Sequence, residues 1–424
     1  MRIVFIHTGI EFDGASLEQG PLGGTETALI SMAKALAKNP EHEIFVFTNT
    51  PQTADYDGVH YLPVRNLYVW SASHSVDVLI SIRQWIPFWL PIKSRLRVYF
   101  SPDAYDQPFL KRAIEVGLDV HGEKITLSLF PPQDFFNSID YFFCVGKWQA
   151  ETFVSGLGFP RAKIFVTGNA VNTTFFKPLE LAHRKNRIMY TSTPFRGLEY
   201  LARYYPKLKV RAPDVGLDVF SGMQLYGMTD KDDQEQYGTL YEALKNAGAC
   251  LHGPVRQQQL AKVMCANRVL TYPNTFAETF CISVLEAQAA GLPVVTSKKG
   301  AMPERITNGV DGFLIAGEPH EESYEREFIQ ITAKLLQDET LWKQISSDAH
   351  KKAATQTYEG LAENWLEFFN EALNIRHEAV APLMPCLKPL EVHLPQKKNI
   401  RLKIEETTLR HFLRQGFQLY GFSF

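Results

Sequence analysis

The sequence has few cysteines, no long apolar segment and no excess of charge of one sign. Its five cysteines form no Cys-x-x-Cys pair, and their odd number argues against both a disulfide framework and a zinc knuckle. No apolar run approaches the ~18 residues of a membrane-spanning helix. The apolar start is also too short for the hydrophobic region of a signal peptide. We therefore expect a cytoplasmic protein that at most associates peripherally with the inner face of a membrane.

The charges almost cancel, since 44 Lys and Arg stand against 46 Asp and Glu, for a net charge of -2. This balance argues against a nucleic-acid-binding protein, whose surface is usually strongly basic. It leaves room for a local basic pocket that binds a phosphate. With 424 residues, 45% of them hydrophobic, the chain is long enough for two or three globular domains of ~150 residues each.

Known cofactor and metal motifs are missing as well. The sequence contains no P-loop, no His-Glu-x-x-His pattern and only a poor dinucleotide fingerprint around Gly20, Gly23 and Gly24. An Asp-x-Asp motif does occur in the charged run 230–233, far from any predicted strand end. We interpret this run as a solvated loop, and we predict neither a bound metal nor a cofactor.

Short apolar runs alternate with helical patterns along most of the chain. Continuous apolar strands between helices indicate parallel sheets that are covered on both faces. The pattern restarts after a junction near 170–186, which predicts two doubly wound α/β domains facing a cleft, over 1–172 and 173–360. We predict strands over 2–7, 43–48, 76–82, 96–100, 141–146, 162–169, 187–193, 217–222, 250–253, 268–273 and 293–297, with helices over 26–38 and 196–206, the second one stopped by Pro206.

The end of the chain has a different character. We predict that a helix over 361–378 crosses back to the first domain and that 379–424 is an appended tail. The tail has seven Lys and Arg against three Asp and Glu, so it is basic by about four charges. It is either a hairpin or helix packed on a domain, or a segment that docks to a partner or a membrane. The aromatic and cationic stretch 83–97 allows a similar choice between core packing and contact with a membrane or a lipid-linked acceptor.

The most informative stretch runs from Pro273 to Val295. A strand ends at its start, a loop carries Glu278, and a helix from about Ile282 to Ala290 carries Glu286 one turn inside. In parallel sheets, ligands bind beyond the carboxyl ends of the strands, and a helix N-terminus attracts anions. A carboxylate accepts two hydrogen bonds from a diol. The unit can therefore hold a sugar hydroxyl, a diphosphate and a ribose together, as a nucleotide-sugar site requires.

The same stretch carries a family resemblance. Two glutamates separated by seven residues, then Ala-x-Ala-x-Gly-x-Pro-Val-Val and the segment 308–313, resemble the retaining glycosyltransferases of family 4 (glycosyl transferases group 1). The resemblance extends over 1–375 and includes the segments 23–26, 168–172 and 193–198. It implies the GT-B fold, with two Rossmann-like domains facing a cleft and, here, a C-terminal extension.

The resemblance also implies an activity. It is metal-independent transfer of a sugar, with retention, from a nucleoside diphosphate sugar to a glycan, a lipid-linked acceptor or a small molecule, in surface glycan, lipopolysaccharide or glycolipid biosynthesis. UDP or GDP is the expected nucleotide. The alternatives are a sugar-nucleotide epimerase or hydrolase on the same fold, or a member that binds nucleotide-sugars without catalysis. The oligomeric state stays open.

Site residues are implied position by position. The expected catalytic residues are Glu278, Arg196 and Asp103, the last standing where many members have a His, with loop capping as its alternative. Arg256 or Lys262 is a candidate for a second cation on the diphosphate. The expected substrate-binding residues are Gly23, Gly24, Gly253, Val255, Thr279, Phe280, Cys281 and Glu286.

Each assignment has a purely structural alternative. Glu286 would then be a surface helix residue, Glu278 a cap, Arg196 a solvated charge, and the Gly23–Gly24 pair a tight turn.

Overall fold

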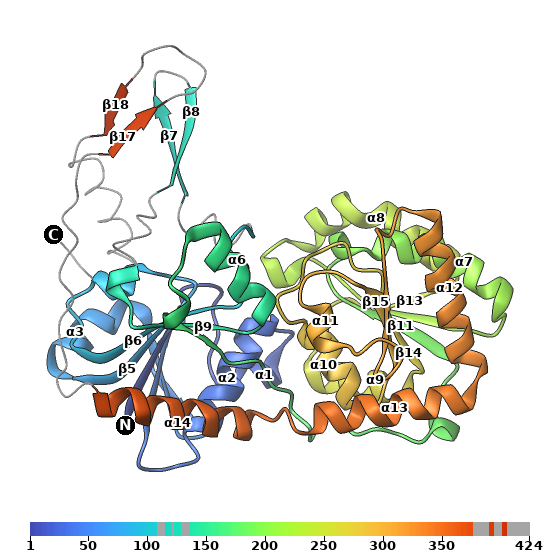
Figure 1. Cartoon of the computed structure of the whole chain (residues 1–424), viewed down its shortest axis with the longest axis horizontal. Helices are drawn as coiled ribbons and strands as arrows, with labels where there is room; N and C mark the ends of the chain where they lie inside the picture. Colours follow the sequence, from blue (N-terminus) through green and yellow to red (C-terminus); the bar gives the residue numbers. More distant parts are fainter. Residues whose placement is uncertain (108–114, 121–122, 129–135, 376–389, 394–400, 405–424) are drawn as a thin grey trace.

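The computed structural model describes residues 1–107, 115–120, 123–128, 136–375, 390–393 and 401–404. It contains two α/β lobes side by side along the long axis of the molecule, each built on a mainly parallel sheet (Figure 1). The predicted α/β class with two parallel-sheet domains is confirmed. The predicted division after residue 172 falls between the last strand of the first sheet and the first strand of the second sheet.

The first sheet has eight strands in the described part of the chain, in the order β10-β9-β6-β5-β1-β2-β4-β3. All neighbours pair in parallel except β3 and β4, which are antiparallel. The strands are β1 (Arg2–Ile6), β2 (Glu43–Thr48), β3 (Ala54–Tyr56), β4 (Val59–Pro63), β5 (Val76–Ile82), β6 (Ser94–Ser101), β9 (Tyr141–Cys144) and β10 (Ile164–Val166). Helical segments of this domain are α1 (Ser16–Gln19), α2 (Gly24–Leu36), η1 (Val64–Asn66), α3 (Leu67–Ser73), η2 (Ile86–Trp89), α6 (Lys147–Leu157) and η3 (Arg161–Lys163).

The second sheet has six strands in the described part, all parallel, in the order β13-β12-β11-β14-β15-β16. The strands are β11 (Arg187–Thr191), β12 (Gly216–Phe220), β13 (Cys250–Leu251), β14 (Val269–Tyr272), β15 (Val294–Ser297) and β16 (Phe313–Ile315). The helical segments are η4 (Leu181–His183), η5 (Pro194–Arg196), α7 (Leu198–Arg211), η6 (Gln224–Tyr226), α8 (Asp230–Asn246), α9 (Gln257–Ala266), α10 (Ile282–Ala289), α11 (Met302–Arg305), α12 (Glu322–Gln337) and α13 (Glu339–Ala354).

The long helix α14 (Tyr358–Ile375) follows the second domain in sequence and packs on the first (Figure 1). Its Trp365 contacts three aromatic rings of the first domain, with ring centroids 6.4 Å from Phe5, 5.9 Å from Phe100 and 5.0 Å from Phe143. These rings come from β1, β6 and β9, so one side chain ties the C-terminal helix to three strands. The segment between α13 and α14 therefore joins the two domains a second time.

Two further pairs of strands are antiparallel: β7 (Glu115–Val120) with β8 (Glu123–Ser128), and β17 (Leu390–His393) with β18 (Arg401–Ile404). The second pair belongs to the predicted tail 379–424. The rest of that tail lies outside the described residues.

The aromatic stretch after β5 is part of the core. Trp85, Phe88 and Trp89 around η2 are each at most 3% exposed. Of the two interpretations offered by the sequence, core packing therefore holds for these three rings.

The predicted helix end at Pro206 is wrong. Helix α7 continues past this proline to Arg211, with Pro206 inside it. A proline inside a helix removes one backbone hydrogen bond and strains the preceding turn. The turns on both sides of Pro206 nevertheless bury Tyr205 and Leu208 against the second sheet. This burial outweighs the local preference to stop.

The predicted loop at 230–233 is wrong as well. These residues are the first turn of α8, where acidic side chains interact favourably with the helix dipole. Thr229 caps the helix by accepting a hydrogen bond from the backbone N–H of Asp232 (3.2 Å). Asp233 is buried and accepts a hydrogen bond from the hydroxyl of Tyr241 (3.1 Å). The charge run is therefore a helix start.

The packing of α14 leads to a stability prediction. Trp365→Ala should lower the free energy of unfolding by about 3–5 kcal/mol, because removing the indole leaves a cavity among three aromatic rings. Chemical denaturation, followed by circular dichroism, measures the change. Glu363→Ala, at an exposed position of the same helix, is the control and should change stability by less than about 0.5 kcal/mol. A loss below about 1 kcal/mol for Trp365→Ala would show that α14 is not anchored through this ring.

Candidate active site

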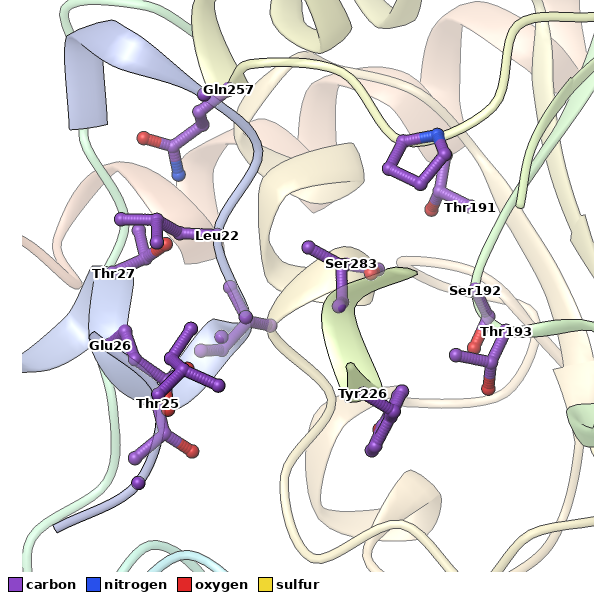
Figure 2. A pocket seen from close by; sticks show the side chains of 18 of the residues that line it. Leu22, Thr25, Glu26, Thr27, Thr191, Ser192, Thr193, Tyr226, Gln257 and Ser283 are labelled. Atoms are coloured by element: carbon purple, nitrogen blue, oxygen red, sulfur yellow. The ribbon is translucent and has the colours of Figure 1, made fainter. Parts of the chain in front are cut away.

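A cavity of about 470 Å³ lies between the two domains. Small-molecule sites are commonly hollows of ~300–1,000 Å³. Figure 2 shows residues from the start of α2, among them Thr25 and Glu26, on one wall, and Tyr226 and Ser283 of the second domain on the other. The carboxyl ends of β1, β5, β11 and β12 lead into this cavity, as expected of a ligand site in parallel sheets.

The second-domain wall includes the N-terminus of α10. Cys281 precedes the helix with a φ of 69°, and this left-handed turn directs the chain into α10. Ile282 and Ser283, the first two helical residues, line the cavity. The first N–H groups of a helix have no partner within the helix and carry the positive end of its dipole. This wall therefore offers hydrogen-bond donors to an anion.

Glu286 lines the cavity from inside α10 and is only 5% exposed. Its Oε1 accepts a hydrogen bond from Nε2 of Gln257, in the first turn of α9, at 2.7 Å. Burial raises the pKa of Glu286 to about 7, against a lowering by the Gln257 hydrogen bond. Glu286 is thus a buried cavity residue and not the surface helix residue of the alternative interpretation.

Arg196 and Glu278 form one unit. Nη1 of Arg196 lies 2.9 Å from Oε1 of Glu278, and the same oxygen accepts a hydrogen bond from the Tyr272 hydroxyl at 2.6 Å. Nη2 of Arg196 donates to the Tyr226 hydroxyl at 3.0 Å, and the guanidinium carbon lies 4.2 Å from the ring centroid of Phe276. Burial alone would lower the pKa of Arg196, but the negative charge of Glu278 keeps it above its ordinary value.

The other predicted residues divide into two groups. Within the described part of the chain, the cavity lining includes Arg196, Glu286, Gly23, Gly24 and Val255. In the same part it does not include Glu278, Asp103, Gly253, Thr279, Phe280 or Cys281.

Two residues of the second group have contacts that explain their position. Thr279 donates its hydroxyl hydrogen to the carbonyl of Pro102 in the first domain (2.6 Å), so it joins the domains. The ring of Phe280 packs under the guanidinium of Arg305, 4.1 Å away.

The glycine pair at the start of α2 is explained by close contacts. A Cβ on Gly24 would lie 3.2 Å from Cδ1 of Ile282, so glycine lets the first turns of α2 and α10 approach each other across the cavity. A Cβ on Gly23 would collide with the carboxylate of Glu26. A side chain at either position would therefore require Glu26 or Ile282 to move.

The first-domain wall contains polar residues to which the sequence had suggested no role. His7 and Glu26 are nearly buried, with Nε2 of His7 3.3 Å from Oε1 of Glu26. The backbone N–H of Gly9 donates to Nδ1 of His7 at 3.1 Å, which assigns the ring proton to Nε2. Burial would raise the pKa of Glu26, but the hydrogen bond from His7 and the electrostatic interactions with His7 and Arg83 lower it.

Arg83 also lines this first-domain wall, together with His7, Glu26 and Thr25. His7 and Arg83 directly follow β1 and β5. Their position at the carboxyl ends of two predicted strands was the available sequence signal.

Asp103, the predicted replacement for the family's His, is bound to Arg83. Its Oδ2 lies 2.6 Å from Nε of Arg83, and Gln149 donates a hydrogen bond to its backbone carbonyl at 2.8 Å. Asp103 therefore lies behind a cavity residue.

The described residues contain neither a metal-binding cluster nor a membrane-spanning helix. Among them, no group of three or more His, Cys, Asp or Glu side chains is arranged to hold a metal ion. In the same residues, no helix is both long enough and apolar enough to cross a membrane.

Comparison with known proteins shows which family this chain resembles. Residues 186–338 match the family described as glycosyl transferases group 1. The second domain is thus similar to the group 1 glycosyltransferases of family 4. This confirms the family resemblance that the sequence motifs carry.

Three curated proteins illustrate this similarity. A phosphatidylinositol N-acetylglucosaminyltransferase subunit from Arabidopsis thaliana is 28% identical over 193 residues, which are 43% of this chain and 39% of that protein. D-inositol 3-phosphate glycosyltransferase from Streptomyces griseus is 43% identical over 76 residues, 18% of this chain and 16% of that protein. Spore coat protein SA from Bacillus subtilis is 22% identical over 370 residues, 82% and 95% of the two chains. The alignments thus span less than half the length of the first two relatives.

Solved structures show the fold. Sucrose-phosphate synthase from Thermosynechococcus elongatus superposes with a TM-score of 0.65 at 14% identity, covering 88% of this chain and 99% of that chain. HepE of Anabaena, solved in complex with UDP-glucose, gives 0.64 at 16% identity, covering 88% and 100%. WaaG, a glycosyltransferase involved in lipopolysaccharide biosynthesis, gives 0.60 at 14% identity, covering 87% and 99%. The predicted GT-B fold is confirmed.

The raised pKa of Glu286 leads to a prediction about stability and pH. An ordinary Glu pKa of 4.5 in the unfolded chain rises to about 7 in the folded protein. The stability that Glu286 contributes is therefore complete below pH 4.5 and is lost as the pH rises through 7. Glutamine has no proton to lose. Glu286→Gln should therefore raise the melting temperature of the unliganded protein more at pH 8 than at pH 5.

Differential scanning calorimetry over this pH range measures the effect. The exposed Glu363→Gln serves as the control and should show no pH-dependent difference. An equal shift for Glu286→Gln at pH 5 and pH 8 would contradict the raised pKa.

Proposed function

We propose that this protein transfers a sugar, with retention of configuration, from a nucleoside diphosphate sugar to a hydroxyl group of an acceptor. One observation carries the proposal: a single cavity brings the buried carboxylate of Glu286, the start of α10 and the guanidinium of Arg196 together, facing the Gly23–Gly24 turn. A hexose is the proposed sugar. The proposed acceptor is a glycan, a lipid-linked molecule or a small molecule in the biosynthesis of surface glycans, lipopolysaccharide or glycolipids.

The chemistry of the walls supports one orientation of the donor. The carboxylate of Glu286 would accept hydrogen bonds from the ribose diol. The base would lie near the turn at Gly253 and Val255, and the diphosphate between Arg196 and the first N–H groups of α10. The sugar would point toward the loop from Glu278 to Cys281. HepE, which shares the fold, has been solved with UDP-glucose and with UDP. A UDP-sugar is therefore the first donor to test, with GDP-sugars second.

The proposed reaction follows from this orientation. The bond between the anomeric carbon and the diphosphate oxygen breaks, and the acceptor oxygen bonds to the same face of that carbon. The acceptor's proton passes to the diphosphate oxygen that leaves. Negative charge grows on the diphosphate in the transition state. Arg196 and the N–H groups of α10 would stabilise this charge without rearranging, which is the usual source of electrostatic catalysis.

Glu278 supports this arrangement from behind. Its carboxylate holds Arg196 and the Tyr272 hydroxyl through one oxygen. With the backbone amides of Thr279, Phe280 and Cys281, it would also hold hydroxyl groups of the transferred sugar. The two glutamates are then not an acid–base pair, since Glu286 would serve the opposite end of the donor. Closer contact between the domains around a bound donor would exclude water, which would otherwise hydrolyse the donor.

Nucleotide binding is the first test. Isothermal titration calorimetry of the wild type with UDP, GDP and ADP should show binding of at least one of them. Glu286→Ala should weaken that binding about 10- to 100-fold, because the ribose diol loses the carboxyl group that accepts its two hydrogen bonds. Glu242→Ala, at an exposed position on α8 where the carboxylate pairs with its helix neighbour Lys245, is the control. Absence of binding for all three nucleotides would refute the proposal.

Turnover is the second test. Arg196→Ala should reduce sugar transfer about 10²- to 10³-fold, as loss of one transition-state donor typically does. Mass spectrometry of the products, with UDP-glucose and a panel of hydroxyl acceptors, measures the transfer. The same donor incubated without an acceptor is the comparison. Free sugar as the main product would identify a hydrolase, and an epimer, which has the donor's mass and is recognised by nuclear magnetic resonance, would identify an epimerase. Nucleotide binding without any product would identify a non-catalytic member.

A further inference from the structure

The two walls of the cavity present arginines in the same manner. Arg83 of the first domain and Arg196 of the second both line the cavity. Each guanidinium is held by a nearly buried carboxylate, Asp103 at 2.6 Å and Glu278 at 2.9 Å. In the described part of the chain, neither carboxylate belongs to the cavity lining. Two arginines, one from each domain, are therefore directed into one cavity from opposite sides.

Arg83 is fixed in place before any ligand arrives. Its φ of 63° is left-handed, a conformation that a non-glycine residue keeps only where its surroundings hold it. The backbone N–H of Arg83 donates to the carbonyl of Phe100 (2.9 Å), and its carbonyl accepts from the Tyr99 hydroxyl (3.2 Å). Its Nη2 also donates to Oγ1 of Thr25 (3.0 Å) and to Asp103. Both the backbone and the side chain of Arg83 are thus held in place at the cavity wall.

The two arginines reach the same region. Arg196 donates to the Tyr226 hydroxyl, and the charges of Arg196 and Arg83 both act on the pKa of Tyr226 by lowering it against the effect of burial. Thr25, the neighbour of Arg83, and Tyr226 lie on facing walls (Figure 2). Burial alone would lower the pKa of Arg83, but the charges of Asp103 and Glu26 raise it, so the guanidinium stays positive.

The cations that the sequence suggested as a second diphosphate ligand lie elsewhere. Arg256 donates through Nη1 to the carbonyl of Glu18 (2.9 Å). Over the described residues, neither Arg256 nor Lys262 belongs to the cavity lining.

We infer that Arg83 is the second cation on the donor's diphosphate, supplied by the first domain, and that Asp103 is a positioning residue that aims it. This inference rests on the proposed function, because it assumes that a nucleoside diphosphate occupies the cavity. Its consequence is that the nucleotide, bound mainly by the second domain, is also held by the first domain through its terminal phosphate. The sequence had suggested Asp103 as a catalytic residue. In this inference Arg83 contacts the diphosphate, and Asp103 acts only by positioning Arg83.

The test compares nucleotides with and without the terminal phosphate. The probes are UDP, GDP or ADP, whichever binds the wild type, and the corresponding monophosphate, titrated by isothermal calorimetry. Arg83→Gln should weaken the diphosphate about 10-fold or more, because a charge-assisted hydrogen bond is lost, and should change the monophosphate by less than about 2-fold. Asp103→Asn keeps the positive charge of Arg83 but holds its guanidinium less firmly. The affinity for the diphosphate should therefore fall less than in Arg83→Gln, and the affinity for the monophosphate should again stay unchanged.

Two controls separate this role from a structural one. Arg95→Gln removes an arginine of the same domain that pairs with Asp77 at 3.2 Å outside the cavity lining, and it should alter neither affinity. Arg83→Lys keeps the charge without the planar fork, so it should lose part of the diphosphate affinity and serves if Arg83→Gln does not fold. Equal losses for both nucleotides, or an unchanged diphosphate affinity, would overturn the role of Arg83. A wild type that binds no nucleoside diphosphate would instead overturn the proposed function.

Discussion

The site depends on the close approach of two helix starts, α2 in the first domain and α10 in the second. The approach is tight at Gly24, where a Cβ would lie 3.2 Å from Cδ1 of Ile282 and would require that side chain to shift. Direct contacts between the domains hold this approach on one side of the cavity: Thr279 donates to the carbonyl of Pro102, and Gln107 donates to the carbonyl of Ala277 at 2.7 Å. Two helix N-termini and the carboxyl edges of two sheets consequently face a single hollow, where their dipoles favour the same anion.

One energetic constraint applies to the charged side chains around this cavity. Taking an ion out of water is costly unless a partner compensates it. Arg196 is paired with Glu278 and Arg83 with Asp103, and the carboxylate of Glu26 is hydrogen-bonded to His7. Glu286 is different, since its carboxyl accepts from the neutral amide of Gln257 and burial raises its pKa to about 7. Strongly shifted groups gather at functional sites, so this carboxyl is a cost to the unliganded protein that a ligand's hydroxyl groups can offset.

Much of the fold could be predicted, because local patterns of apolar and polar residues indicate strands and helices. Buried parallel strands are continuous apolar runs, so most strands of the two sheets were located to within a few residues, whereas many of the helices between them were not predicted. The errors arose where a local rule met tertiary packing. Pro206 lies inside α7 because residues beyond it are buried, and the acidic run at 230–233 begins α8 because a cap and the helix dipole favour it. For the site, Arg196, Glu286 and the glycine pair line the cavity, whereas Glu278 and Asp103 lie behind arginines that do, and their roles stay predictions.

By itself, the sequence determined the two-domain α/β architecture, the family, and the loop and helix that carry Glu278 and Glu286. These features depend on residues that are near one another along the chain. Only the tertiary structure decided which side chains face the cavity and which hold others in place. His7, Glu26, Arg83 and Asp103 come from four separate segments, and the folding of one parallel sheet brings them together. Pairing between such distant charges leaves no pattern in the order of residues, because it depends on directions in space that the packed sheets impose.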